Sequence, residues 1–123
     1  MSVLNLRRMK PGGTPWGGYS AYADGVQVGE CAFKSAPFDG HVEVAYHTFE
    51  AFERRGHATQ MVRELVAIAR RADPALVIIA QTLQETNAST RILQKLGFTC
   101  EGTVHHPEDG EVLEWRLATD ARG

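Results

Sequence analysis

The spacing of apolar residues changes at Gly56, and this change restricts the chain to few folds. Residues 41–49 (HVEVAYHTF) alternate as in a strand, with Val42 and Val44 on one face and Glu43 on the other. After Gly56 the spacing becomes that of an amphipathic helix, whose apolar face comprises Ala58, Met61, Val62, Leu65, Val66 and Ala69. The sequence therefore predicts a strand followed closely by a helix.

The segment after this helix predicts a second strand. Pro74 ends the helix, because proline disfavours helical geometry in the residue before it. Residues 75–83 (ALVIIAQTL) are nearly all apolar, as in a strand covered on both faces. A strand, a helix and a buried strand in this order predict parallel pairing through a right-handed crossover.

Antiparallel elements are expected on both sides of this unit. YSAYA and VQVGECAF flank Asp24-Gly25, a dipeptide favoured in tight hairpin turns. TNASTRILQKLGF predicts a short helix, with Ala88, Ile92 and Leu96 facing inward and Gly97 as its C-terminal stop. FTCEGTVHH and EVLEWRL predict a closing hairpin around PEDG.

Length and punctuation indicate one domain. A chain of 123 residues with 43% hydrophobic content can bury one core but not two. Residues 1–18 contain KPGGTPWGG, too rich in glycine and proline for a helix or strand. We therefore expect a flexible lead-in at 1–18, one mixed α/β (α+β) domain at 19–118 and a tail at 119–123.

The stretch FERRGHATQM (52–61) lies where the central strand gives way to the helix. Free N–H groups and the helix dipole can bind an anion there, and the small residues Gly56 and Ala58 allow close approach. Arg54 and Arg55 can add charge from the side. The alternative from these residues alone is a solvated loop with a simple glycine turn.

Composition excludes several classes of protein. A formal net charge of −2 argues against a general nucleic-acid or membrane-surface binder, which carries a basic excess. No apolar run reaches the roughly 18 residues of a membrane span, and the N-terminus lacks the apolar centre of a signal peptide. We therefore expect a cytoplasmic protein.

Cysteine and histidine give no support for a metal site. Cys31 and Cys100 are far apart and form no CxxC or Cys/His motif, so both are expected to be small buried apolar residues. His105 and His106 are neighbours on a predicted strand and point to opposite faces, which does not suit chelation.

Two motifs together resemble the GNAT superfamily of acyl-CoA-dependent N-acetyltransferases. ERRGHA is similar to the family's pyrophosphate loop at Gly56 and Ala58, although Glu53 replaces the usual Arg or Gln. ETNASTRILQKLGF, VEVAYHTF and PEDGEVLEW resemble segments of the ribosomal-protein alanine N-acetyltransferases (RimJ/RimL-like branch) in the same order. The resemblance extends from about Tyr19 to Leu117.

The resemblance implies acetyl-CoA as co-substrate, bound between the two splayed central strands. Main-chain groups of His47, Thr48 and Phe49 would pair with the pantetheine arm, and Asn87 and Ser89 would lie beside it. The pyrophosphate would meet the amides of Arg54, Arg55, Gly56, His57, Ala58 and Thr59.

The resemblance also implies catalytic roles. Glu43 would take a proton from the incoming ammonium, and Ser89 would protonate the departing thiolate, since Leu93 stands where many members have a tyrosine. From the residues alone, Glu43 is equally an exposed strand residue, Asn87 an N-cap and Ser89 a first-turn residue.

The N-terminus departs from the family, whose members begin with a strand and two helices that form much of the acceptor pocket. With this strand and these helices missing, the acceptor side would be open, lost or completed by another chain, which favours a homodimer. The sequence thus predicts an acetyltransferase acting on a primary amine of a small molecule or protein N-terminus. The alternatives are a non-catalytic acyl-CoA-binding protein and a partner-binding protein.

Overall fold

A computed structural model, which describes residues 4–10, 14–82 and 88–118, contains one mixed seven-stranded sheet in the order β1-β2-β3-β4-β5-β7-β6. The strands are β1 (Leu4–Arg8), β2 (Gly18–Ala23), β3 (Val26–Phe33), β4 (His41–Thr48), β5 (Val77–Thr82), β6 (Thr99–His106) and β7 (Gly110–Leu117). The helices are α1 (His57–Ala72), α2 (Ala88–Lys95) and the 3₁₀ turn η1 (Glu50–Phe52). The predicted mixed α+β fold class is confirmed.

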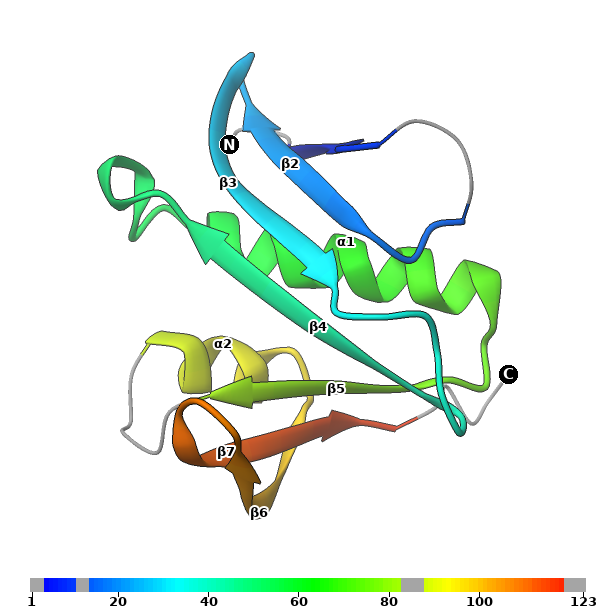
Figure 1. Ribbon diagram of the computed structural model, residues 1–123. Helices are drawn as coiled ribbons and strands as arrows, with labels where there is room; N and C mark the ends of the chain where they lie inside the picture. The colour runs from blue at the N-terminus through cyan, green and yellow to red at the C-terminus, as the bar shows by residue number, and fades with distance from the viewer. Residues whose placement is uncertain (1–3, 11–13, 83–87, 119–123) are drawn as a thin grey trace.

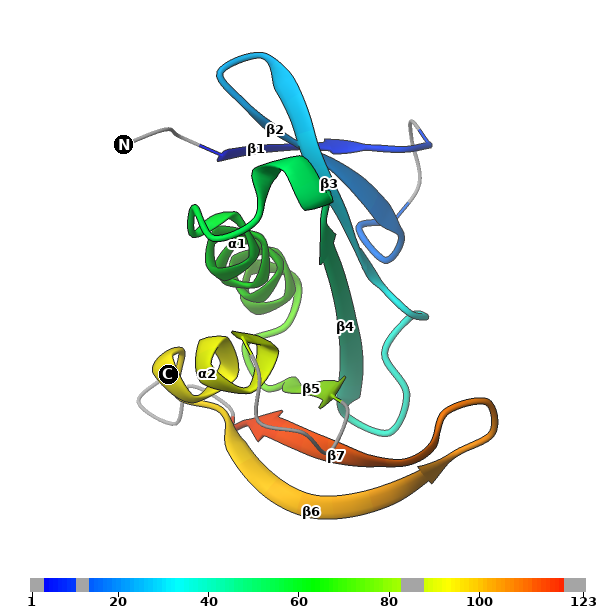
Figure 2. The ribbon, with the colours of Figure 1, turned by 90° about the vertical axis from the view of Figure 1, so that its left-hand side faces the viewer.

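The crossover predicted from the change of period is present. β4 and β5 are parallel, α1 connects them, and all other neighbouring strands are antiparallel. Both α1 and α2 cover the same face of the sheet (Figures 1 and 2). α1 ends at Ala72, and its C-cap Asp73 comes directly before Pro74, as the sequence predicts.

Local turn chemistry explains two further element boundaries. Asp24 and Gly25 have φ values of 51° and 80°, which the two-residue turn between β2 and β3 requires. Gly97, at φ 93°, ends α2, and the Phe98 N–H donates to the Leu93 carbonyl at 2.9 Å. This bond closes a Schellman motif and turns the buried Phe98 ring toward the core.

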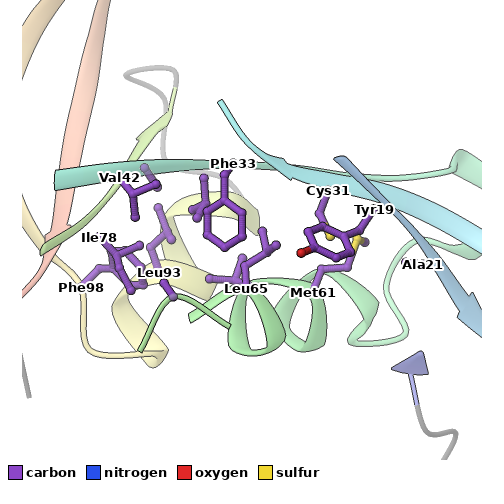
Figure 3. Packing of buried hydrophobic residues seen from close by; sticks show 14 of the residues in the cluster. Tyr19, Ala21, Cys31, Phe33, Val42, Met61, Leu65, Ile78, Leu93 and Phe98 are labelled. Atoms are coloured by element: carbon purple, nitrogen blue, oxygen red, sulfur yellow. The ribbon is translucent and has the colours of Figure 1, made fainter. Parts of the chain in front are cut away.

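The core lies between the sheet and the two helices. Met61 and Leu65 of α1 point toward Tyr19, Cys31 and Phe33, as Figure 3 shows. At the other end of the core, Leu93 of α2 lies near Ile78 and Phe98 (Figure 3). Burying one such large side chain contributes roughly 1.5–3 kcal/mol, so these contacts fix the helices on the sheet.

The expectation of an unstructured lead-in is wrong for residues 4–8. They form β1, which pairs with β2 in register from Leu4↔Ala23 to Arg8↔Tyr19. Leu4 is buried, and the Arg7 guanidinium lies 4.7 Å from the centre of the Tyr22 ring. The strand expected to be missing is therefore present, and the described residues between β1 and β2 contain no helix. Pairing with β2 stabilises this segment, which has only two apolar residues of its own, both leucines.

Two burial predictions also need correction. Cys31 is buried, and burial raises the pKa of its thiol to about 12, but Cys100 is exposed on the edge strand β6. On α2 the fully buried side chain is Leu93, whereas Ile92 and Leu96 are half-buried. The side chain of Ala88 lies outside the described residues. Leu93 belongs to the buried core, and Leu96 packs against that core from the side.

Neither helix in the described part of the chain is long and apolar enough to cross a membrane.

The homodimer stays a prediction, which a solution mass measurement would test.

Gly29 allows β3 and β4 to approach closely. A Cβ atom there would lie 2.3 Å from the His47 carbonyl oxygen and 3.0 Å from Met61 Cε. We predict that Gly29→Ala destabilises the fold by roughly 1–3 kcal/mol, because backbone cannot yield as a side chain does. Thermal unfolding measures the loss. Gly17→Ala is the matched control, since its Cβ would meet nothing within 4 Å; equal stability of the two variants would contradict the prediction.

Candidate functional site

Pairing between β4 and β5 stops halfway along the two strands. The register runs only from His41↔Val77 to Glu43↔Ile79, after which the strands diverge (Figure 1). Within the described chain, β4 from Val44 to Thr48 has no strand partner on its β5 side. An unpaired strand edge offers N–H and C=O groups to an extended ligand.

A pocket of about 520 Å³ lies beside this free edge. Eight residues predicted to bind the cofactor line it: His47, Thr48, Arg54, Gly56, His57, Ala58, Thr59 and Ser89. The pocket is completed by four residues to which the sequence gave no such role: Tyr46, Phe52, Glu53 and Ile92. Residues from β4, the loop before α1 and both helices thus meet around one cavity.

Three predicted residues stand outside this set. Asn87 lies outside the described residues. Phe49 does not line the pocket, and its N–H donates to the Val28 carbonyl at 2.8 Å while its carbonyl accepts from the Phe52 N–H. The Arg55 guanidinium lies 5.8 Å from the centre of the Phe52 ring, beside a second cavity of about 330 Å³.

The start of α1 presents free amides to the larger pocket. Its first intrahelical bond runs from the Gln60 N–H to the Gly56 carbonyl, so the N–H groups of the three residues between them have no acceptor within the helix. No side chain caps this end, and its first turn carries no acidic residue. Because no acidic side chain in this turn opposes it, the positive end of the helix dipole favours the binding of an anion.

Two left-handed residues shape the loop before α1. Gly56 has φ 83° and Arg54 has φ 66°. Glycine adopts this conformation freely, whereas arginine does so at a cost of about 1 kcal/mol or more. The strained Arg54 lines the pocket, which is typical of a residue held in place for a binding site.

His57 is the first residue of α1, and its side chain is buried. It is only 6% exposed, and its Nδ1 atom has no hydrogen-bond partner among the described residues. The ring lines both the larger pocket and the cavity beside Arg55. A buried imidazole nitrogen without a partner is costly, so the His57 side chain is a candidate ligand-binding group, whereas the sequence had indicated a role only for its main-chain amide.

A smaller pocket of about 290 Å³ adjoins the first. Glu43, Lys34 and Gln81 line it, together with Tyr46 and Ser89, which also line the larger pocket. The Glu43 Oε2 atom lies 3.1 Å from Lys34 Nζ as an ion pair, without the angles of a hydrogen bond. Tyr46 and Ser89 are thus shared by the two cavities, while the candidate base lies in the smaller one.

The Tyr46 hydroxyl is the polar group that sequence reasoning missed here. Burial raises the pKa of this phenol, and the facing Ser89 side chain partly offsets that shift. The hydroxyl makes no hydrogen bond of normal geometry within the described residues. Leu93 is fully buried in the core, so α2 offers no side chain from that position, and the phenol comes from β4 instead. In the sequence, Tyr46 alternates with Val42 and Val44 along the predicted strand, and no motif marks it as a site residue.

Metal ligation finds no support in the described residues, where no three His, Cys, Asp or Glu side chains group together. His106 instead stabilises the turn between β6 and β7. Its Nδ1 accepts hydrogen bonds from the N–H groups of Glu108 and Asp109, each at 3.1 Å.

Comparison with known proteins identifies the family and the fold. The sequence pattern of the family described as acetyltransferase (GNAT) domain matches residues 5–99. No curated protein sequence matches the chain.

Three solved structures have similar folds. An acetyltransferase from Salmonella typhimurium, which modifies the N-terminal serine of ribosomal protein L7/L12, is 21% identical with a TM-score of 0.70. The acetyltransferase YncA from the same organism, solved with acetyl-CoA, is 23% identical with a TM-score of 0.70. A GNAT-family acetyltransferase from Bordetella pertussis is 25% identical with a TM-score of 0.67. The matches cover 84%, 84% and 82% of this chain, and 63%, 64% and 64% of those chains respectively.

Gly56 provides a direct test of the anion site. We predict that Gly56→Ala weakens CoA binding by roughly tenfold, because a Cβ disfavours the left-handed φ that orients the helix amides. Isothermal titration calorimetry measures the affinity.

The matched control is Gly110→Ala, at φ 76° where β7 begins. Neither Cβ would meet an atom within 4 Å, so both substitutions impose the same kind of backbone strain. Only Gly56→Ala is expected to weaken binding; equal losses in both variants would show that general destabilisation is responsible.

Proposed function

The chain belongs to the acetyltransferase (GNAT) domain family, and on that premise we propose that it transfers an acetyl group from acetyl-CoA to a primary amine. The observation that carries the proposal is the pair of pockets in the gap between β4 and β5. One holds the free amides of α1, the other holds Glu43, and they share Tyr46 and Ser89.

Acetyl-CoA occupies the larger pocket in this proposal. Its pyrophosphate accepts hydrogen bonds from the amides at the start of α1, with Arg54 adding positive charge. Its pantetheine arm lies along the unpaired edge of β4 near His47 and Thr48. The thioester then lies beside Ser89, where the two pockets meet.

The acceptor amine enters from the smaller pocket and attacks the thioester directly. Glu43 takes one proton from the ammonium, because only a neutral amine has a free electron pair. The nitrogen bonds to the carbonyl carbon, and the carbon–sulfur bond breaks. The nitrogen gives up a second proton, and the departing thiolate takes this proton through the hydroxyls of Tyr46 and Ser89. Holding both substrates in one ternary complex supplies the proximity that such an attack needs.

Glu43→Gln separates binding from chemistry. We expect kcat to fall by roughly 10²–10⁴, because the amide cannot accept the proton, while acetyl-CoA affinity stays unchanged. Thiol release over a panel of amines and peptides measures turnover, and calorimetry measures binding.

Glu101→Gln is the matched control on the exposed strand β6, and it should behave as the unsubstituted protein. Acetyl-CoA binding without turnover in the unsubstituted protein would point to an acyl-CoA-binding module. An active Glu43→Gln variant would remove Glu43 as the base.

Tyr46→Phe tests the route of the proton to sulfur. Burial raises the pKa of this phenol, so the phenol is protonated at neutral pH and its hydroxyl can donate there. We expect kcat to fall by roughly tenfold with little change in stability, because the ring volume is retained. Steady-state kinetics and thermal unfolding provide the two measurements.

The control for Tyr46→Phe is Tyr22→Phe, which removes a hydroxyl from β2 outside both pockets. Full turnover of Tyr46→Phe would leave Ser89 or solvent as the proton donor.

A further inference from the structure

An ion pair and a backbone hydrogen bond hold Lys34 next to Glu43 at the smaller pocket. Beyond the 3.1 Å between Nζ and Oε2, the Lys34 N–H donates to the Glu43 carbonyl at 2.9 Å. This backbone bond continues the β3–β4 ladder past Phe33↔Val44 and places the two side chains next to one another. Their side chains are 44% and 25% exposed, while the Glu43 Oε2 atom that faces Lys34 is itself buried, so a ligand would meet the Glu43 carboxylate at its other oxygen.

The described lining of the smaller pocket is electrically neutral. Its two charged residues are Lys34 and Glu43, and their formal charges cancel. A simple ammonium ion that approaches Glu43 competes with Lys34 for the single negative charge of the carboxylate. A ligand that carries its own negative charge beside the ammonium avoids this cost.

We propose that the acetyl acceptor is a zwitterionic α-amino acid, an inference that rests on the proposed acetyl transfer. Its nitrogen and the nearer carboxylate oxygen are separated by the α-carbon and the carboxyl carbon and lie about 3 Å apart. This spacing matches the 3.1 Å between Lys34 and Glu43. Laid antiparallel to the pair, the ammonium meets Glu43 and the carboxylate meets Lys34, so that four alternating charges form a closed ring.

The remaining walls fit a small acceptor. Gln81 adds an amide, and Val44 and Ala45 add apolar surface. The Thr82 hydroxyl already accepts a hydrogen bond from Trp115 Nε1 at 3.0 Å. A protein N-terminus is disfavoured, because a neutral peptide carbonyl replaces the carboxylate and gives Lys34 no anion. The attack itself is unchanged: nitrogen bonds to the acetyl carbon, sulfur leaves as the thiol, and Glu43 takes the ammonium proton.

The test compares L-alanine, L-serine and L-methionine with their own carboxamides. Each pair differs only in the carboxylate. Calorimetry measures their binding to the protein with saturating CoA and again without it, so that neither turnover nor CoA binding is required. We expect at least one free acid to bind about tenfold or more tightly than its amide.

Lys34→Met is expected to change the affinities of the free acids and of the amides in opposite directions. The free acids should lose roughly tenfold in affinity, because their carboxylate loses its partner, while the amides should gain, because Glu43 is released. A merely structural role for Lys34 would shift both series in the same direction. Lys95→Met, on the exposed end of α2, is the control and should change neither series.

The outcomes separate this inference from the proposed function. Amides that bind as tightly as the acids, or no binding by either series, would overturn the zwitterion proposal. Thiol release from acetyl-CoA with amides or peptides would in that case still uphold acetyl transfer. Acids that bind selectively without thiol release would uphold the zwitterion site and count against the proposed reaction.

Discussion

The parallel pairing of β4 with β5, and its end at Glu43↔Ile79, is the constraint on which the rest of the structure depends. α1 connects these two strands, which are paired at one end and diverge at the other. Both pockets lie in that divergence. Because no other described strand pairs with β4 there, its backbone polar groups are available to a ligand rather than to the sheet.

The two pockets use electrostatics in different ways. The larger one relies on backbone amides at the start of α1, in a loop whose geometry depends on the left-handed Gly56. Fixed dipoles of this kind bind an anion with little reorganisation. The smaller one holds two opposite side-chain charges, Lys34 and Glu43, against each other. Tyr46 and Ser89 line both pockets, so they lie between the amides of the larger pocket and the two opposite charges of the smaller one.

The sequence predicted features that depend on neighbours along the chain and missed those that depend on distant contacts. The Asp24-Gly25 turn, the helix start at Gly56 and the crossover were all predicted, because turn chemistry and periodicity are local. β1 was missed, since it is held by β2 rather than by its own pattern. The burial of Leu93 and the exposure of Cys100 likewise follow from how α2 and β6 pack.

The choice of Glu43 as the candidate base came from the resemblance to the family. The sequence by itself indicated the order of the elements from β2 onward and the loop at Gly56 as a candidate anion site. These follow from spacing, glycine conformation and residue type, which are properties of short segments. Only the tertiary structure decided that Tyr46 faces Ser89 and that Lys34 lies 3.1 Å from Glu43. Such contacts depend on strand register and on where β4 separates from β5, which are set by packing across the whole sheet.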